Sequence, residues 1–598
     1  MNTRRQFLIT AAMGGLTVTA CRRQPQSAPA GPPATPGAPP AFGTTPGTGP
    51  NVTPITFAEA EKLAQVSMTD AERATAVENW RRMMAPLVER RVGPRKVAIE
   101  PDIAPATRWD PRLSSATAGP AADRFIRTAA TDPLPASDAD IAFAPVAKLS
   151  RWIERKALTS ERLTHIYLGR IGQYDAKLRS VITVTKDAAL AQARQADAEI
   201  AAGKYRGPLH GIPYGVKDLL DTAGIATTYG AEPFKNRVPS TDSVVIRRLK
   251  DAGAVLVAKL SLGALALNDI WFGGQTMNPW LLEEGASGSS CGPGAATAAG
   301  LVAFSIGSET GGSIIAPAMR CGITGLRPTF GRVARTGAMT LCWTLDKLGP
   351  MTRTVEDAML VLNAITGPDS GDVSSVPSYV DFDATASING VRVGYFPAWM
   401  QDNPSTDVDR NALDTLKKLG LDTTPVSLPA WPYNSLMPVL FAEAAASFEE
   451  ITLNRAINTL KAQVPDAWPN LFRQSRFLSA VDFVQADRLR RRVAMEMTRI
   501  FSEVDVLLVP SLRDEMLTIS NFTGHPSLTL RAGFVNVSEA RSDWAPDPSN
   551  PLPTFSPARR VPHGVTLVGR LFDEGTIARV GLALEGTLGV SGERPAGY

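Results

Sequence analysis

The sequence predicts an α/β protein built around one large domain. From Phe143 to the C-terminus, segments with helical periodicity alternate with short apolar runs that are typical of buried strands. The helical segments cover residues 146–155, 160–174 and 188–202, and the clearest strands are 254–258 and 506–509. The 598 residues are 44% hydrophobic and 20% charged, which excludes a wholly disordered, collagenous or polytopic membrane protein. Because no repeat with a period of about 20 to 50 residues is present, one domain over residues 143–598 is expected.

The first 21 residues have the pattern of an export signal. Arg4 and Arg5 precede an uncharged apolar stretch that ends at Ala20, and its roughly 14 residues are too few to span a bilayer core of about 30 Å. Cys21 then closes a Val-Thr-Ala-Cys sequence that resembles a bacterial lipobox. We expect a twin-arginine signal peptide over residues 1–21, lipidation of Cys21, and an exported, periplasmic protein held at the membrane by its lipid alone. An ordinary cleaved signal with an incidental cysteine is the alternative.

Residues 22–54 are expected to form a disordered tether. Between residues 24 and 54 the chain has ten prolines, five glycines and no charged residue. Such a segment cannot bury enough apolar surface to offset the chain entropy lost on folding.

Residues 55–142 are expected to form a helical N-terminal extension and a connecting arm. Two pairs of residues have the spacing of a capping box, Thr56 with Glu59 and Thr69 with Glu72. Residues 97–142 are rich in proline, aspartate and alanine and show no clear period. This part is interpreted as an arm that runs over the surface of the main domain.

Charge and residue counts exclude several classes of function. Lys and Arg number 62 and Asp and Glu 58, for a net charge of +4, or +2 once Arg4 and Arg5 are removed with the signal. So small a charge supplies no field for nucleic acid, and no nucleic-acid partner is expected. The four cysteines form no C-x-x-C pair and have no histidine nearby, so neither a metal nor another cofactor is expected. With four histidines in the chain, the chemistry is expected to use another base.

A glycine- and serine-rich stretch over residues 285–328 is the most unusual part of the sequence. Within it, residues 307–313 read Gly-Ser-Glu-Thr-Gly-Gly-Ser. Successive glycines let backbone N–H groups meet where no side chain intrudes, as an oxyanion hole requires. Ser313 is therefore a candidate nucleophile, with the N–H groups of Thr310, Gly311 and Gly312 as candidate oxyanion donors. A pair of tight turns without chemistry is the alternative.

Lys217 is the candidate base for this serine. It lies at the end of an apolar run bounded by glycines, which predicts a buried strand. Burial disfavours the ammonium form and can lower the pKa of a lysine by several units, and a serine needs such a base to become nucleophilic. A surface ion pair of Lys217 with Asp218 or Asp221 is the alternative.

These motifs resemble the amidase signature family over roughly residues 143–598. The matching stretches are 211–218 (Gly-Ile-Pro-Tyr-Gly-Val-Lys-Asp), 287–329 with the segments 307–313 and 321–329 (Cys-Gly-Ile-Thr-Gly-Leu-Arg-Pro-Thr), 521–526 and 562–570. The resemblance implies a mixed central β-sheet covered by helices. It also implies a hydrolase that cleaves a carbon–nitrogen bond in a small-molecule amide.

The resemblance further implies a triad of serine, cis-serine and lysine. Its members fall on Ser313, Ser289 and Lys217, with Ser289 lying 24 residues before Ser313. The peptide bond between Gly288 and Ser289 would be cis. Ser289 would relay a proton between Ser313 and Lys217, because a hydroxyl both donates and accepts. Ser290 is expected to support the loop by hydrogen bonding.

Two positions depart from the family pattern beside the nucleophile. Glu309 stands where an aspartate is usual, and Ile315 stands where an arginine is usual. A buried carboxylate without a partner would cost several kcal/mol or take up a proton. We expect Arg320, another unusual residue nearby, to pair with Glu309 and hold the turn that carries Ser313. A solvated Arg320, with Glu309 binding backbone N–H groups, is the alternative.

Three other functions remain open at this point. Residues 288–292 (Gly-Ser-Ser-Cys-Gly) fit the nucleophile elbow of an α/β-hydrolase esterase, with Ser290 as nucleophile and His525 or His563 as base. That elbow must follow a strand, and residues 282–287 are not expected to form one. A non-catalytic binding lipoprotein and an amidotransferase subunit that acts on aminoacyl-tRNA are the other two. The intact triad and the export signal argue against them, respectively.

Overall fold

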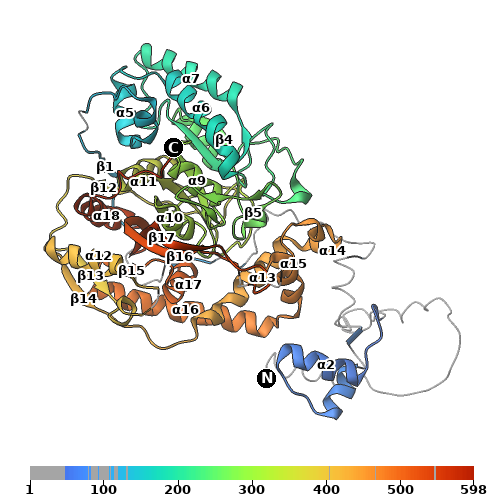
Figure 1. Ribbon diagram of the computed structural model, residues 1–598. Coiled ribbons are helices and arrows are strands. Elements are labelled where there is room, and N and C mark those ends of the chain that lie inside the picture. The colour runs from blue at the N-terminus through green and yellow to red at the C-terminus, as the bar shows by residue number, and fades with distance from the viewer. Residues whose placement is uncertain are drawn as a thin grey trace, which may run out of the picture. The chain divides into compact units, whose positions relative to one another are not determined.

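The computed structural model describes residues 47–77, 80–81, 92, 107, 109–112, 119–129, 132–402, 404–464, 466–544 and 547–598. The expected signal peptide, Cys21 and most of the tether lie outside these residues. The chain forms two compact units, Met1–Ala98 and Ile99–Tyr598, and Figure 1 shows that the second contains the central sheet. Within the part of the chain that the structure describes, none of the helices combines the length and the apolar character that a membrane span requires.

The first unit contains α2 (Pro54–Ala64). Its N-cap is Thr53, which exchanges hydrogen bonds with Thr56, so the helix begins earlier than predicted and the capping box of Thr56 with Glu59 is wrong. The sequence pattern was ambiguous here because two threonines lie three residues apart. The second predicted box is confirmed by reciprocal backbone-to-side-chain hydrogen bonds between Thr69 and Glu72.

The second unit is organised around a mixed sheet of eleven strands (Figure 1). In spatial order they are β14 (Asp422–Pro425), β13 (Arg392–Tyr395), β15 (Val506–Pro510), β17 (Thr554–Gly569), β16 (Ser527–Glu539), β10 (Thr324–Arg327), β11 (Lys347–Thr352), β9 (Phe304–Glu309), β3 (Pro213–Lys217), β4 (Val255–Leu260) and β2 (Val181–Val184). β3 pairs in parallel with β9 and with β4, and β13 pairs in parallel with β14 and with β15, whereas the remaining pairs are antiparallel. Three two-stranded pairs complete the strands: β1 (Arg124–Ile126) with β12 (Asp381–Asp383), β5 (Ile270–Trp271) with β6 (Gly274–Gln275), and β7 (Met277–Asn278) with β8 (Leu281–Gly285).

Helices cover this sheet, as the resemblance implied. The helices of the second unit are α4 (Asp138–Phe143), α5 (Val146–Glu154), α6 (Ser160–Leu178), α7 (Lys186–Ala201), α8 (Val244–Asp251), α9 (Cys291–Ala298), α10 (Ile315–Cys321), α11 (Val355–Ile365), α12 (Asp407–Lys418), α13 (Met437–Ser447), α14 (Glu449–Leu453), α15 (Trp468–Gln474), α16 (Ala480–Glu503), α17 (Asp514–Phe522) and α18 (Glu574–Leu588). The predicted helices at 146–155, 160–174 and 188–202 correspond to α5, α6 and α7. The predicted strands at 254–258 and 506–509 correspond to β4 and β15.

Part of the expected connecting arm belongs to the second unit. β1 adds in parallel to β12, and the rings of Phe125 and Phe382 lie 5.3 Å apart. The arm is therefore held by a short strand pairing and an aromatic contact.

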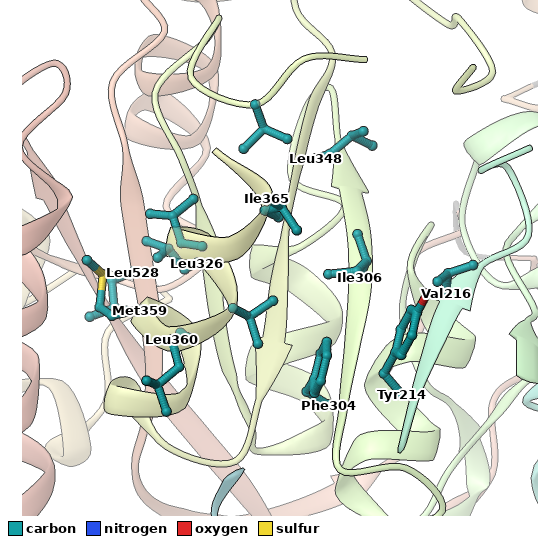
Figure 2. Close-up of a cluster of buried hydrophobic side chains, with 14 of the residues drawn as sticks. Tyr214, Val216, Phe304, Ile306, Leu326, Leu348, Met359, Leu360, Ile365 and Leu528 are labelled. Atoms are coloured by element: carbon teal, nitrogen blue, oxygen red, sulfur yellow. The ribbon is translucent and has the colours of Figure 1, made fainter. Parts of the chain in front are cut away.

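The main core lies between the middle of the sheet and α11 (Figure 2). Tyr214 and Val216 of β3 enter it beside Phe304 and Ile306 of β9, and the rings of Tyr214 and Phe304 stack at 5.3 Å. Successive side chains of a strand point to opposite faces of the sheet. Lys217, which follows Val216, therefore points away from this core.

Candidate active site

Lys217 ends β3 with its side chain fully buried. Its Nζ lies 2.8 Å from Ser289 Oγ, 3.0 Å from Ser290 Oγ and 2.9 Å from Ser308 Oγ. Among the described residues, no carboxylate lies within ion-pair distance of this amine. Three hydroxyl groups thus surround a lysine that lacks a charged partner.

Burial lowers the pKa of Lys217 from 10.5 to about 7, because the ammonium form loses its hydration, and the nearby acidic groups, Asp346 and Glu309 among them, offset this only in part. The alternative ion pairs are not formed. Asp218 instead pairs with Lys259 at 3.0 Å, and Asp221 pairs with Arg237 at 2.6 Å. A neutral amine is therefore available near neutral pH.

The loop before α9 brings two serines to this amine. The peptide bond between Gly288 and Ser289 is cis, as the resemblance implied. Ser290 Oγ donates to the carbonyl of Ser308 at 3.1 Å and accepts the N–H of Ser308 at 3.2 Å. Ser290 therefore ties the loop to β9, in agreement with the supporting role expected of it.

Ser313 lies in the turn that joins β9 to α10. Its carbonyl accepts the N–H of Ser290 at 3.2 Å, which places the turn directly against the loop of Ser289. Unlike Lys217 and Ser289, Ser313 is partly exposed, and the neighbouring Gly311 is exposed. Ser313 is thus partly open to solvent, whereas the lysine is buried.

The same turn leaves backbone donors free. Within the described part of the chain, the N–H groups of Gly311, Gly312 and Ser313 have no hydrogen-bond acceptor. Gly312 has φ +123°, a conformation that favours glycine. Thr310 is held by a hydrogen bond from its Oγ1 to Asp346 Oδ1 at 2.6 Å. The turn is therefore held in place while its donors remain available to an oxygen atom.

Glu309 supports this turn with a partner that the sequence pattern does not reveal. It is fully buried and forms an ion pair with Arg327 at 2.6 Å. Its Oε1 also accepts from Asn521 Nδ2, and its Oε2 accepts the N–H groups of Ile314 and Ile315 at 2.7 and 2.9 Å. Burial alone would raise the pKa of Glu309, but the charges of Arg327 and Lys347, together with the hydrogen-bond donors, outweigh it and lower that pKa. A buried carboxylate thus fixes the first N–H groups after Ser313.

The predicted ion pair of Glu309 with Arg320 is wrong. Arg320 lies in the last turn of α10, where it pairs with Asp543 at 3.0 Å and donates to the carbonyl of Arg541 at 3.0 Å. Arg327 reaches Glu309 because it ends β10, two strands from β9 in the sheet. The prediction relied on the short distance between Glu309 and Arg320 in the sequence, whereas the actual partner, Arg327, lies on another strand.

The structure also corrects one premise about the esterase alternative. A strand does precede residues 288–292, since β8 covers Leu281–Gly285. The sequence of β8 does not alternate between apolar and polar residues as a half-buried strand would, because the charged Glu284 is buried. Glu284 can be buried because it pairs with Arg541 at 2.6 Å.

The esterase alternative nevertheless lacks a base. His525 bonds to Thr523 Oγ1 at 2.8 Å, and His563 bonds to Asp409 Oδ2 at 2.9 Å. Within the described residues, Ser290 has no histidine partner. Its hydroxyl is engaged with Lys217 and β9 instead.

Some residues of this site were not singled out from the sequence. Arg327 and Asn521 lie inside stretches that match the family pattern, so those stretches were the available signal. Ser308 directly precedes Glu309 in the nucleophile motif. Asp543 has no comparable signal, because it lies in a proline-rich loop outside every motif.

Comparison of the sequence with known proteins identifies the family of this chain. The amidase family model matches residues 162–578. A glutamyl-tRNA(Gln) amidotransferase subunit of Roseiflexus sp. strain RS-1 is 35% identical over 465 residues, which cover 72% of this chain and 93% of that protein.

Solved structures agree with this match. The peptide amidase of Stenotrophomonas maltophilia is similar with a TM-score of 0.63 and 28% identity, over 76% of this chain and 98% of that one. An amidase family protein of Bacillus anthracis gives a TM-score of 0.65 and 25% identity, over 78% and 96%. Sequence similarity spans nearly the whole length of these relatives, and therefore the chain is a member of the amidase family.

Proposed function

We propose that the protein hydrolyses the carbon–nitrogen bond of linear amides through an acyl-enzyme on Ser313. The observation that carries this proposal is the contact of 2.8 Å between Lys217 Nζ and Ser289 Oγ, in a site where burial lowers the pKa of the lysine to about 7. The proposed substrate is a small-molecule amide, and no nucleic acid, metal or other cofactor takes part.

The hydrogen bonds favour one direction of proton transfer. A neutral lysine amine has two N–H groups and one lone pair. Ser290 gives its own proton to the carbonyl of Ser308, so it can only accept from Lys217. If Ser308 Oγ accepts the second N–H at 2.9 Å, the lone pair faces Ser289. Ser289 can then give its proton to Lys217 while it takes one from Ser313.

The turn around Ser313 supplies the remaining parts of the reaction. Ser313 Oγ attacks the amide carbonyl, and the N–H groups from Thr310 to Ser313 stabilise the oxyanion. The proton held on Lys217 returns through Ser289 to the leaving amine as the carbon–nitrogen bond breaks. Water, activated by the same relay, then hydrolyses the ester on Ser313.

The pH dependence of kcat/KM should follow the ionisation of Lys217. Protonated Lys217 cannot accept a proton, so activity should fall about tenfold per unit at acidic pH. It should level off above a midpoint at about 7, the lowered pKa of this lysine. Initial rates on an anilide from pH 5 to 9 measure this. A midpoint near 10 would contradict a neutral, buried base.

A substrate panel tests the proposed activity. Purified protein should release product from anilides or primary amides, and Ser313→Ala should not. Hydrolysis of esters alone, dependent on Ser290, would favour the esterase. Binding without turnover of any member would favour a non-catalytic binding lipoprotein.

An amidotransferase component is the second candidate, favoured by the 35% identity to a glutamyl-tRNA(Gln) amidotransferase subunit. That function requires transfer of an amide nitrogen to glutamyl-tRNA. Incubation with glutamine and glutamyl-tRNA, followed by analysis of the amino acid on the tRNA, separates the two functions. We expect no glutaminyl-tRNA, because the twin arginine predicts export away from tRNA.

We also propose that the protein is exported to the periplasm and held at the membrane by lipid on Cys21. Replacing Arg4 and Arg5 by lysine should leave unprocessed protein in the cytoplasm. Cys21→Ser should move the processed protein into the soluble periplasmic fraction, because no other anchor is expected from the sequence. Fractionation and immunoblotting measure both. A Cys21→Ser protein that still sediments with membranes would contradict the lipid anchor.

A further inference from the structure

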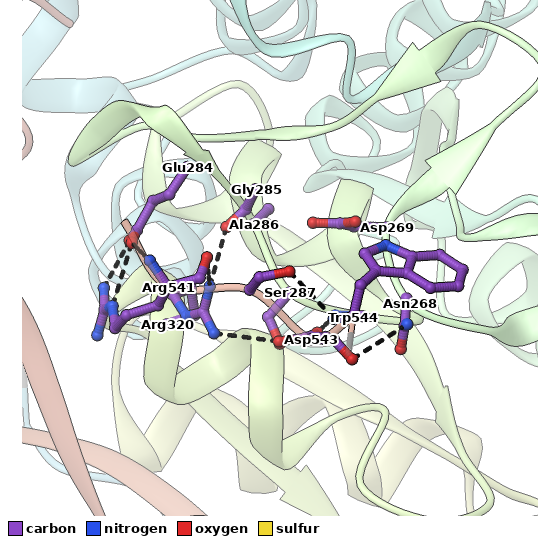
Figure 3. A network of polar contacts seen from close by, with 12 residues as sticks. Asn268, Asp269, Glu284, Gly285, Ala286, Ser287, Arg320, Arg541, Asp543 and Trp544 are labelled. Atoms are coloured by element: carbon purple, nitrogen blue, oxygen red, sulfur yellow. Dashed lines mark hydrogen bonds and ion pairs between the residues drawn. The ribbon is translucent and has the colours of Figure 1, made fainter. Parts of the chain in front are cut away.

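The loop between β16 and β17 contacts residues 286–290, the loop between β8 and α9, which will be called the cis-serine loop. The loop between β16 and β17, residues 540–553, will be called the hairpin loop. Its Asp543 Oδ2 accepts a hydrogen bond from Ser287 Oγ at 2.6 Å and another from the N–H of Gly288 at 2.9 Å. Figure 3 shows Asp543 beside Ser287, with Arg320 on its other side. One carboxylate thus binds the two residues that precede Ser289.

Asp543 is itself held from two directions. Arg320 Nη2 donates to its Oδ1 at 3.0 Å, and Arg320 is 4% exposed, so this ion pair is largely shielded from water. Asn268 Nδ2 donates to the carbonyl of Asp543 at 3.3 Å (Figure 3). Both oxygens of the carboxylate and its backbone carbonyl are therefore engaged, which fixes the position of Oδ2.

A second anchor joins the same two segments. The backbone N–H of Arg541 donates to Glu284 Oε2 at 2.9 Å, and its guanidinium donates to Oε1 at 2.6 Å. Burial alone would raise the pKa of Glu284, but Arg541 outweighs it and lowers that pKa. The hairpin loop therefore holds the segment 284–288 at both ends.

On the side away from Asp543, the cis-serine loop packs tightly against the backbone of Asn268. A Cβ atom at Gly288 would lie 1.7 Å from the carbonyl oxygen of Asn268, so only glycine allows this approach. Gly288 is thus confined between the backbone of Asn268 and the carboxylate of Asp543. Because Ser289 follows Gly288 directly, this confinement fixes where the hydroxyl of Ser289 lies.

We propose that Asp543 is a positioning residue for the amide hydrolysis proposed above: it holds Ser287 and Gly288 so that Ser289 Oγ stays within reach of Lys217 Nζ. The inference rests on the proposed function, in which Ser289 relays the proton. Among the described residues, Asp543 forms no hydrogen bond with Lys217, Ser289 or Ser313; its partners are Ser287, Gly288, Asn268 and Arg320. It acts only through the position of Ser289. Arg320 supports Asp543 and also donates directly to the carbonyl of Gly285 at 3.4 Å.

Removal of the carboxylate should lower the rate of the chemical step. In Asp543→Ala we expect kcat to fall by about 100-fold, the effect of displacing a reacting group by about 1 Å, while KM changes by less than about threefold. Asp547→Asn is the control in the same loop, because the bonds of Asp547 within the described residues stay inside that loop, to Ser549 and Asn550. An unchanged kcat in Asp543→Ala would overturn the proposal.

The pH dependence of kcat/KM in Asp543→Ala distinguishes a positioning role of Asp543 from a purely structural role. The hydrogen bonds from Ser287 and Gly288 to Asp543 will be called the clamp. Ser290 and Ser308 contact Lys217 without it, so we expect the midpoint of kcat/KM to stay at about 7 in Asp543→Ala. Entry of water around Lys217 would raise that midpoint instead. A raised midpoint would therefore show a structural role and contradict positioning.

Two further variants test the hydrogen bonds themselves. Asp543→Asn keeps one acceptor oxygen, so its kcat should be about tenfold higher than that of Asp543→Ala. Ser287→Ala should reduce kcat in the wild-type background but have no further effect on Asp543→Ala, because both changes remove the same bond. Additive effects in this double-mutant cycle would contradict the clamp.

Backbone hydrogen exchange distinguishes a failure of this inference from a failure of the proposed function. Peptides that cover residues 284–290 should exchange faster in Asp543→Ala than in wild type or in Asp547→Asn, whether or not an amide is turned over. Wild-type protein without amidase activity would refute the function and leave this readout intact. Unchanged exchange in an active enzyme would refute the clamp alone.

Discussion

Replacing Ser313 by alanine should lower amide turnover by at least about 1,000-fold, because the change removes the attacking oxygen. The loss should appear in kcat with little change in KM, since Ser313 forms its new bond only during the reaction. Ser313 is partly exposed, and its hydroxyl has no hydrogen-bond partner among the described residues, so the variant should fold normally. Steady-state kinetics and circular dichroism check the two expectations. Near-normal turnover would end the assignment of Ser313.

Lys217→Met is the companion variant and should reduce kcat to a similar extent. Methionine fills the volume of the buried side chain without an amine, so packing is preserved while the base is lost. The double variant with Ser313→Ala should be no slower than either single one, because the residues act as a unit. Ser290→Ala is the comparison, with an expected loss of about tenfold from a weakened loop. Turnover abolished only in Ser290→Ala would move the nucleophile to that residue.

The fold class was predictable because its signals are local. Buried strands such as β4 and β15 appear as continuous apolar runs, since both of their faces are covered. Helices such as α5 show strong amphipathic periodicity around buried residues. The order of strands in the sheet had no such signal. It depends on pairing between segments that lie far apart in the chain, as with β13 and β15.

The residues of the proposed triad were predictable for a different reason. Lys217, Ser289 and Ser313 each lie in a motif whose glycines serve tight backbone geometry, such as the φ of +123° at Gly312. The glycines pointed to Ser313 and to Lys217, whereas Ser289 was assigned because its motif resembles that of the amidase signature family. The structure brings Lys217 to Ser289 as that pattern implied, and their catalytic roles stay a prediction until the variants are measured.

The residues that support the site could not be derived in the same way. Arg327 reaches Glu309 across the sheet, and Asp543 reaches Gly288 from 255 positions away in the chain. Neither partner is marked by spacing, because an ion pair needs only opposite charges brought together by the fold. Arg320 was a plausible partner of Glu309 by proximity in sequence, yet its side chain serves Asp543.

The buried ion pair of Glu309 with Arg327 should contribute strongly to the free energy of unfolding. Both side chains are fully buried, so Glu309→Gln leaves the charge of Arg327 without its partner in the interior. Loss of one member of a buried pair typically costs about 3 to 5 kcal/mol in the free energy of unfolding. Urea unfolding followed by tryptophan fluorescence measures this at neutral pH. The contribution is lost as pH falls through the lowered pKa of Glu309, so the variants should converge in acid.

A double-mutant cycle should identify the partner of Glu309 directly. Arg327→Met in the Glu309→Gln background removes the stranded charge, so the double variant should be more stable than the sum of the single changes by more than about 1 kcal/mol. The same cycle with Arg320→Met should give a coupling below about 0.5 kcal/mol, because Arg320 contacts Asp543 instead. Glu309→Asp, which keeps the charge, should be milder than Glu309→Gln. Coupling to Arg320 rather than to Arg327 would contradict the arrangement that holds Ile314 and Ile315 behind Ser313.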